Sequence, residues 1–169
     1  MIDLVRYQGI DHDAAIANRR LVSGTLSDQL DVGWAWLSAQ NVSRPQDAGG
    51  IRLGFVPEYP DEALKELLRN MVQHRLYEGT NAPGRVEWFD GRIEFSNPGG
   101  PYMRAAEGDF GAHSDYRNPL ITSRLVAAGY VQQLGRGVRR ARLQLERNGN
   151  PPLEIETDGF TRLIVRRRP

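Results

Sequence analysis

The sequence contains no cysteine, which excludes disulfide bonds and thiolate metal sites. It has no apolar run long enough to span a membrane and no signal-peptide pattern after Met1. Lysine is nearly missing as well, because Lys65 is the only one among 22 lysines and arginines. The formal net charge is only +1, so a bulk field that attracts polyanions is not predicted. These absences favour a cytoplasmic, bacterial protein with no membrane partner.

The three histidines are far apart in the sequence and show no ligand spacing, so we predict no structural zinc site. The 169 residues, 40% hydrophobic and 25% charged, fit one compact soluble unit. Within it, we expect residues 1–50 to form an N-terminal strand and helix that pack onto the core. Residues 51–169 would then form the main domain.

Short strands alternate with helices in the predicted element order. Strands are expected at 4–7, 51–56, 86–89, 92–95, 153–156 and 160–165, and a turn-rich stretch precedes Arg20. Helices are expected to begin after Thr25 or Ser27, after Pro60, at Asn118 and Pro119, and at Val138. This order predicts an α+β fold of two layers, with a mixed, mostly antiparallel sheet and helices on one face.

The helix after Pro60 carries a polar stripe beside its apolar face. Glu66, Asn70 and His74 are each four residues apart and therefore project from the same side. A carboxylate and an amide oxygen suit Mg²⁺, and a carboxylate can polarise an attacking water. The alternative interpretation is a solvated helix face.

Two glycine-containing turns add to this pattern. Asn97, Pro98, Gly99 and Gly100 follow a strand, where glycine lets the backbone approach a flat ligand closely. Gly135-Arg136-Gly137 precedes a helix, whose first N–H groups can hold phosphate. Either turn could also be an ordinary connection.

Residues 101–116 show no periodicity, and a structureless loop of this length is typically functional. We predict that this loop is a lid that is mobile without ligand. The arginines at 139, 140 and 142 were interpreted as a solvated helix face, with a nucleic-acid contact as the alternative.

In order, these parts resemble the GHKL ATPases, such as gyrase, MutL and the histidine kinases. They are most similar to the C-terminal part of RecG-related ATP-dependent DNA helicases or transcriptional regulators. The matching residues are Tyr59, Pro60, Ala63, Leu64, Glu66, Asn70, His74, Arg75, Tyr77, Phe89, Arg92, Ile93, Glu94, Asn97, Pro98, Gly99, Gly100, Arg117, Asn118, Pro119, Gly135, Gly137, Gly159 and Phe160. The resemblance implies a Bergerat fold that binds ATP and Mg²⁺. An AlbA or Schlafen-type domain precedes this module in such proteins, so we expect the chain to be part of a longer protein.

The resemblance also implies roles for single residues. Glu66 would activate water, and Asn70 would hold Mg²⁺. The remaining residues expected to contact nucleotide are His74, Asn97, Gly99, Gly100, Gly135 and Gly137. Among them, Asn97 would face the adenine amino group, Gly135 and Gly137 would line the phosphates, and His74 is a phosphate contact or a structural histidine.

Two departures from the wider superfamily lower the expected activity. Asn97 replaces an aspartate and loses the charge-assisted part of its hydrogen bond. Gly137 is followed by Val138 and Arg139 instead of Leu-Gly. We therefore expect a nucleotide-binding module with weak or no ATPase activity and no unwinding activity of its own. DNA would be contacted through the full-length protein, and a homo-oligomer is an open alternative to a monomer. The alternative is a degenerate interaction or dimerisation module, which predicts a filled or collapsed pocket.

Overall fold

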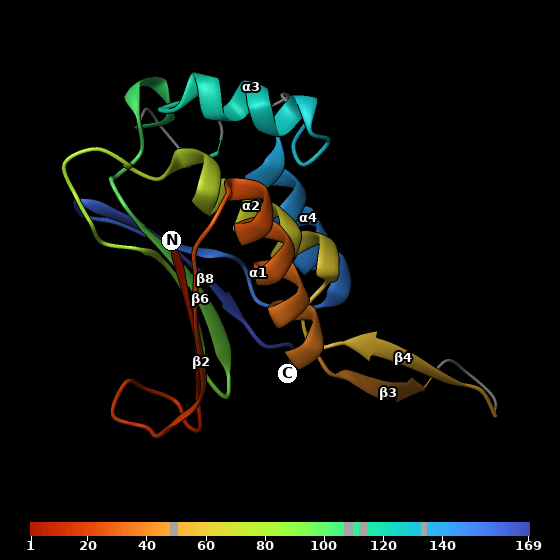
Figure 1. The fold of residues 1–169 in the computed structure, drawn as a ribbon. Coiled ribbons are helices and arrows are strands. Elements are labelled where there is room, and N and C mark those ends of the chain that lie inside the picture. Colours follow the sequence, from red (N-terminus) through yellow and green to blue (C-terminus); the bar gives the residue numbers. More distant parts are fainter. Residues whose placement is uncertain (48–50, 107–109, 112–114, 133–134) are drawn as a thin grey trace.

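The computed structural model describes residues 1–47, 51–106, 110–111, 115–132 and 135–169. A six-stranded sheet forms one layer, in the order β2-β1-β5-β6-β8-β7 (Figure 1). Its strands are β1 (Ile2–Tyr7), β2 (Ile16–Val22), β5 (Gly84–Trp88), β6 (Arg92–Pro98), β7 (Glu154–Thr157) and β8 (Phe160–Arg166). The described helices are α1 (Leu26–Gln40), α2 (Asp61–His74), α3 (Pro119–Ala127), α4 (Gly137–Asn148) and the short 3₁₀ helix η1 (Met103–Ala106). None of the helices in the described ranges is long and apolar enough to cross a membrane.

The predicted α+β class is confirmed. β1 and β5 run parallel, while the other pairs in the sheet are antiparallel. The helices α1, α2 and α4 cover one face, and their apolar side chains share a single core with the sheet (Figure 1).

The period of two along a strand decides which side chains join this core. On β5, Val86 and Trp88 are buried under the helices, whereas Glu87 points to the opposite face. On α2, the buried apolar residues recur at helical spacing and fill the space above the sheet. They are Ala63, Leu64, Leu67, Leu68, Met71 and Val72. The apolar face fixes the rotation of α2, so its polar stripe points away from the core.

Two helix ends have the local chemistry that their sequence predicts, and the start of α3 does not. Thr25 caps α1 in a capping box with Asp28, and Gly149 ends α4 in the left-handed conformation at φ 78°. Asn118 was predicted to cap α3, but its side chain makes no capping bond. Instead, its amide donates to the carbonyls of Gln73 and Arg75, which ties the start of α3 to the end of α2.

Two strands were missed. The stretch before Arg20 was predicted to be turns, but β2 pairs antiparallel with β1 as the edge of the sheet. Its side chains are exposed from Ile16 to Leu21, so no alternation between buried and polar positions reveals it. β3 (Ser43–Asp47) pairs with β4 (Leu53–Pro57) in a separate hairpin that projects from the body (Figure 1).

The predicted lid at residues 101–116 is only partly described. η1 lies within it, and residues 107–109 and 112–114 are outside the described residues. Its predicted mobility stays a prediction.

Candidate functional site

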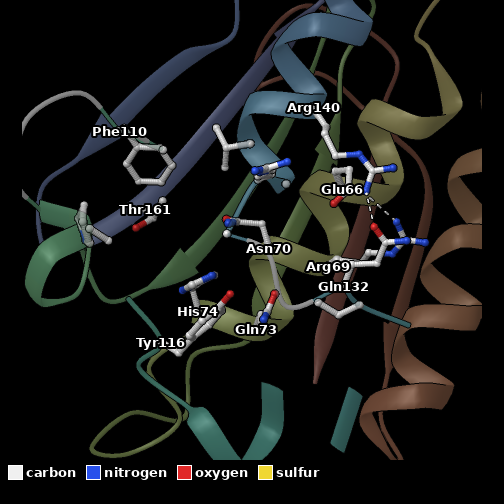
Figure 2. Close-up of a pocket in the computed structure, with 18 of the residues that line it drawn as sticks. Glu66, Arg69, Asn70, Gln73, His74, Phe110, Tyr116, Gln132, Arg140 and Thr161 are labelled. Atoms are coloured by element: carbon white, nitrogen blue, oxygen red, sulfur yellow. Dashed lines mark hydrogen bonds and ion pairs between the residues drawn. The ribbon is translucent and has the colours of Figure 1, made fainter. Parts of the chain in front are cut away.

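The polar stripe of α2 lines a cavity of about 490 Å³ (Figure 2). The stripe is longer than the sequence suggested, because it contributes Glu62, Glu66, Arg69, Asn70, Gln73 and His74. Each of these positions lies three or four residues from another one in the set, so together they share one side of the helix. The volume lies within the range of small-molecule and cofactor sites.

The N-terminal end of α4 forms the facing wall. Gly135, Arg136 and Gly137 all line the cavity, and α4 begins at Gly137. A Cβ atom added to Gly137 would lie only 3.0 Å from Oε2 of Glu66. Gly137 therefore permits a close approach between two helices, and the backbone N–H groups that begin α4 stand beside the carboxylate of α2.

Aromatic residues from the predicted lid form a third wall. Tyr102, Phe110 and Tyr116 line the cavity there, and Thr161 on β8 lies among the lining residues (Figure 2). The site thus combines an aromatic side with a charged side, where Glu66, Arg69 and Arg140 gather.

Six of the eight residues predicted from the sequence meet at this cavity. They are Glu66, Asn70, His74, Gly100, Gly135 and Gly137. Asn97 and Gly99 are not among the described lining residues. Asn97 is 4% exposed, and its amide nitrogen lies 3.3 Å from its neighbour's carbonyl, that of Pro98.

Gly99 has a local reason to be glycine. Its φ is +91°, and a Cβ atom there would come within 2.9 Å of the Cβ of Leu76. The turn is held by Thr161, whose hydroxyl donates to the Gly99 carbonyl over 2.9 Å. Thr161 is the register partner of Asn97 on the neighbouring strand, and it lines the cavity where Asn97 does not. Sequence reasoning missed Thr161, because a threonine inside a strand carries no special signal.

The arginines on the charged side were also missed. Arg140 is exposed, as a solvated helix face predicts, and its Nη1 also lies 3.3 Å from Oε1 of Glu66. Arg69 reaches the same carboxylate oxygen at 3.4 Å. The spacing places Arg140 on the same side of α4 as Gly137, but it does not show which element packs against that side.

A contact to phosphate favours a positively charged side chain, and His74 does not provide one. Burial, with a smaller contribution from the nearby Arg117 guanidinium, lowers the pKa of His74 to about 4. Its ring stacks on Tyr116 with centroids 5.8 Å apart and planes at 19°. The imidazole is therefore neutral at neutral pH and offers an aromatic surface and ring nitrogens, not a cation.

A family model described as "Putative ATP-dependent DNA helicase recG C-terminal" matches residues 81–165. The chain belongs to this family. Among solved structures, the DIP2311 protein from Corynebacterium diphtheriae is similar to it over 99% of the chain, with a TM-score of 0.85 and 26% identity. The chain spans 35% of that protein, so it corresponds to about a third of a longer polypeptide. No curated protein matches the sequence.

The family match begins after α2, so the Glu66 and Asn70 helix lies outside the matched segment. The Gly135–Gly137 turn and Thr161 lie inside it. The cavity is thus built from both parts of the chain.

A second group of ionisable residues lies outside the cavity, on the face of the sheet away from the helices. The ligand-type atoms of His12, Glu87 and Glu94 lie within 4.8 Å of one another. No sequence pattern predicts this group, because the residues come from a loop and two strands. Arg92 already donates to Glu94 over 2.6 Å, and Arg162 lies 3.5 Å from its other oxygen. Since the charge of Glu94 is compensated by arginine, we assign no metal here.

Proposed function

We propose that this chain is an ATP-binding module of the RecG C-terminal family, with weak or no ATPase activity. The observation that carries the proposal is the meeting of two motifs far apart in the sequence. The polar stripe of α2 and the glycine start of α4 meet at the wall of one cavity, where a Cβ atom added to Gly137 would lie 3.0 Å from Oε2 of Glu66.

The chemistry of the walls supports a nucleotide. Arg69, Arg136 and Arg140 line the same cavity as the N–H groups at the start of α4, and both features favour phosphate. On the other side, Tyr102 and Tyr116 provide aromatic surface suited to a purine ring. The cavity is open, which favours this proposal over the degenerate interaction module, for which a filled or collapsed pocket was expected.

The donor set also fits Mg²⁺. Asn70 lines the cavity one helical turn from Glu66, and Mg²⁺ prefers a few protein oxygens together with water and phosphate oxygens. A bound Mg²⁺ would neutralise phosphate charge. In this proposal the side-chain oxygen of Asn70 holds the metal, and Glu66 accepts the proton of an attacking water.

Weak turnover follows from the state of Glu66. Without nucleotide, two guanidinium groups contact one oxygen of its carboxylate, Oε1, at 3.3 and 3.4 Å, so this oxygen is engaged in ion pairs. A general base must reach the proton that it abstracts, and a base held in ion pairs is poorly placed for that.

Calorimetric titration of Mg-ATP tests the proposal. Wild-type protein should bind, and at a hundredfold excess over Kd the ligand should stabilise the fold by ~2.7 kcal/mol. Asn70→Ala should weaken only the Mg²⁺-dependent binding, because the metal loses an oxygen ligand. Gly137→Val should weaken binding with or without metal, because its side chain would fill the approach to Glu66. Asn81→Ala serves as a matched control, since Asn81 is exposed and lies outside the described cavity lining.

Wild-type protein that fails to bind millimolar nucleotide would refute the proposal and leave the interaction module. Equal binding by the wild type and both cavity variants would mean that nucleotide binds elsewhere on the chain. Phosphate release, followed in the same samples, measures any turnover, and Glu66→Gln should abolish it.

A further inference from the structure

Glu66 is held by two arginines from different helices. Arg69 lies one turn further along α2, and Arg140 reaches across from α4. Both contact the same oxygen, Oε1, through an Nη1 atom. Arg140 also donates to the side-chain oxygen of Gln132 over 3.2 Å, so its guanidinium lies at the cavity wall (Figure 2).

Cations are in excess on this wall. Arg69, Arg136 and Arg140 line the cavity, against the carboxylates of Glu62 and Glu66. Glu62 is already paired with Lys65, which lies 2.7 Å away. Glu62 also lies near Arg69 and Arg140, but among the described carboxylates on this wall only Glu66 forms ion pairs with these arginines. The three guanidinium groups would therefore be better balanced by a further anion.

Arg140 and Glu66 differ in how far their side chains are exposed to solvent. The Glu66 side chain is 11% exposed, whereas that of Arg140 is 50% exposed. Arg140 can therefore turn toward a ligand in the cavity at little cost to its own solvation, while Arg69 keeps its contact with the Glu66 carboxylate. Two other arginines of α4 cannot do the same, because Arg139 and Arg142 do not line this cavity.

We infer that Arg140 reads the terminal phosphate of the bound nucleotide and thereby gives up its ion pair with Glu66. This inference rests on the proposed function. A phosphate group offers several anionic oxygens, and guanidinium groups bind such groups through paired hydrogen bonds. A terminal phosphate therefore competes well for Arg140. When it does, the Glu66 carboxylate loses one of its two partners and becomes available to water.

The exchange makes the site selective for a nucleoside triphosphate. A diphosphate lacks the terminal group, so Arg140 stays with Glu66. The exchange also links the two helices to the ligand, since the Arg140–Glu66 pair joins α4 to α2 only in the free state.

Titrations of Mg-ATP and Mg-ADP into four proteins test the inference. The set is wild type, Arg140→Ala, Arg140→Lys and Arg139→Ala. Arg140→Ala should bind Mg-ATP about tenfold or more weakly, since it loses a charge-assisted bond, and should bind Mg-ADP within about twofold of wild type. Arg140→Lys should fall between them, because it keeps the charge but loses the planar fork. Arg139→Ala should match wild type for both ligands.

A second set of Mg-ATP titrations tests the role of the Glu66 carboxylate. Glu66→Gln should raise the affinity for Mg-ATP severalfold in the wild-type background, because Arg140 no longer has to leave a charged partner. It should not do so in Arg140→Ala, and this non-additivity reports the coupling between the two side chains. Thermal unfolding without nucleotide identifies any variant that has lost its fold. If Arg140→Ala is unfolded, the binding of Mg-ATP and Mg-ADP by Arg140→Lys tests the inference instead.

The outcomes distinguish the role of Arg140 from nucleotide binding by the module as a whole. Equal losses for Mg-ATP and Mg-ADP in Arg140→Ala, or no loss for either, would overturn the role of Arg140 while the module still binds nucleotide. Additive effects of Glu66→Gln and Arg140→Ala would overturn the exchange. Wild-type protein that binds neither nucleotide would refute the proposed function itself.

Discussion

His74 lies on the polar stripe of α2, where its imidazole stacks on Tyr116 and is largely withdrawn from water. The pKa of His74 falls to about 4 because burial penalises the charged ring, and the nearby guanidinium of Arg117 adds to the effect. In the unfolded chain an imidazole titrates near 6.5. The folded state therefore binds fewer protons than the unfolded state between these two values.

Folding stability should decrease as the pH is lowered through this interval. The unfolded chain gains a proton on His74 below about pH 6.5, while the folded protein does so only near pH 4, so the loss approaches about 3 kcal/mol at the acid end. Urea unfolding at about pH 7.5 and about pH 5 measures the change, and His74→Gln should make it smaller. An unchanged pH dependence in His74→Gln would show that His74 is not buried as a neutral ring.

Site residues were predictable where the pattern was periodic or chemically rare. Glu66 and Asn70 stand on one helical stripe, and Gly137 stands at a helix start. Each pattern alone also fits a solvated face or an ordinary turn, and only their order along the chain indicated a nucleotide site. Arg140 was missed because its neighbours in an arginine-rich helix have exposed side chains. Its contact with Glu66 depends on how α2 packs against α4, which a single sequence does not express.

Among the elements, the β5–β6 pair carries an arrangement that would normally cost stability. Glu87 and Glu94 are directly opposite each other in the register, and both are almost completely buried. Like charges at such positions repel. Tyr7 donates to Glu87 over 3.2 Å, and Arg92 binds Glu94, while Oε2 of Glu94 has no hydrogen-bond partner among the described residues.

Glu87→Gln should stabilise the protein by about 0.5–1 kcal/mol, because it removes the repulsion and brings an amide donor near Oε2 of Glu94. Glu94→Gln should instead destabilise it by about 1–3 kcal/mol, because Arg92 and Arg162 lose their charged partner. Urea unfolding at about pH 8, where an ordinary imidazole is neutral, compares the two. A loss of stability in Glu87→Gln as large as in Glu94→Gln would show that the charge of Glu87 is needed, and our account of the pair would be wrong.

Elements with a buried side were predictable, and those without one were not. α2 and the β5–β6 hairpin each present a regular apolar face, and the Asp90-Gly91 turn between the strands is a strong hairpin signal. β2 is an edge strand with exposed side chains, and β3 contains Pro45, which normally argues against a strand. The pairings of β2 with β1 and of β3 with β4 rest on backbone hydrogen bonds, which do not depend on a periodic pattern of side chains.

At the scale of the whole molecule, we predict that this chain does not unwind DNA. A motor of that type needs a phosphate loop of the form G-x-x-x-x-G-K-[ST], in which lysine reaches the terminal phosphates. Lys65 is the only lysine, and Leu64 precedes it. A strand-displacement assay with purified protein and Mg-ATP, with an active helicase as positive control, should give no product above the protein-free level. Unwinding that depends on ATP would contradict the prediction.

β1 occupies an interior position of the sheet, between β2 and β5, and Ile2 is the register partner of Gly84. The chain between these two strands includes α1, the β3–β4 hairpin and α2. The pairing of β1 with β5 therefore closes a long loop, and the chain entropy lost in closing it opposes folding until the contacts between the strands have formed. Contacts of this range slow folding, and we expect the β1–β5 pairing to form late. A fragment limited to the family match at residues 81–165 would leave β5 as an unpaired edge and the core without α2. The smallest segment expected to refold cooperatively after denaturation therefore begins at β1, well before the part of the chain by which the family is identified.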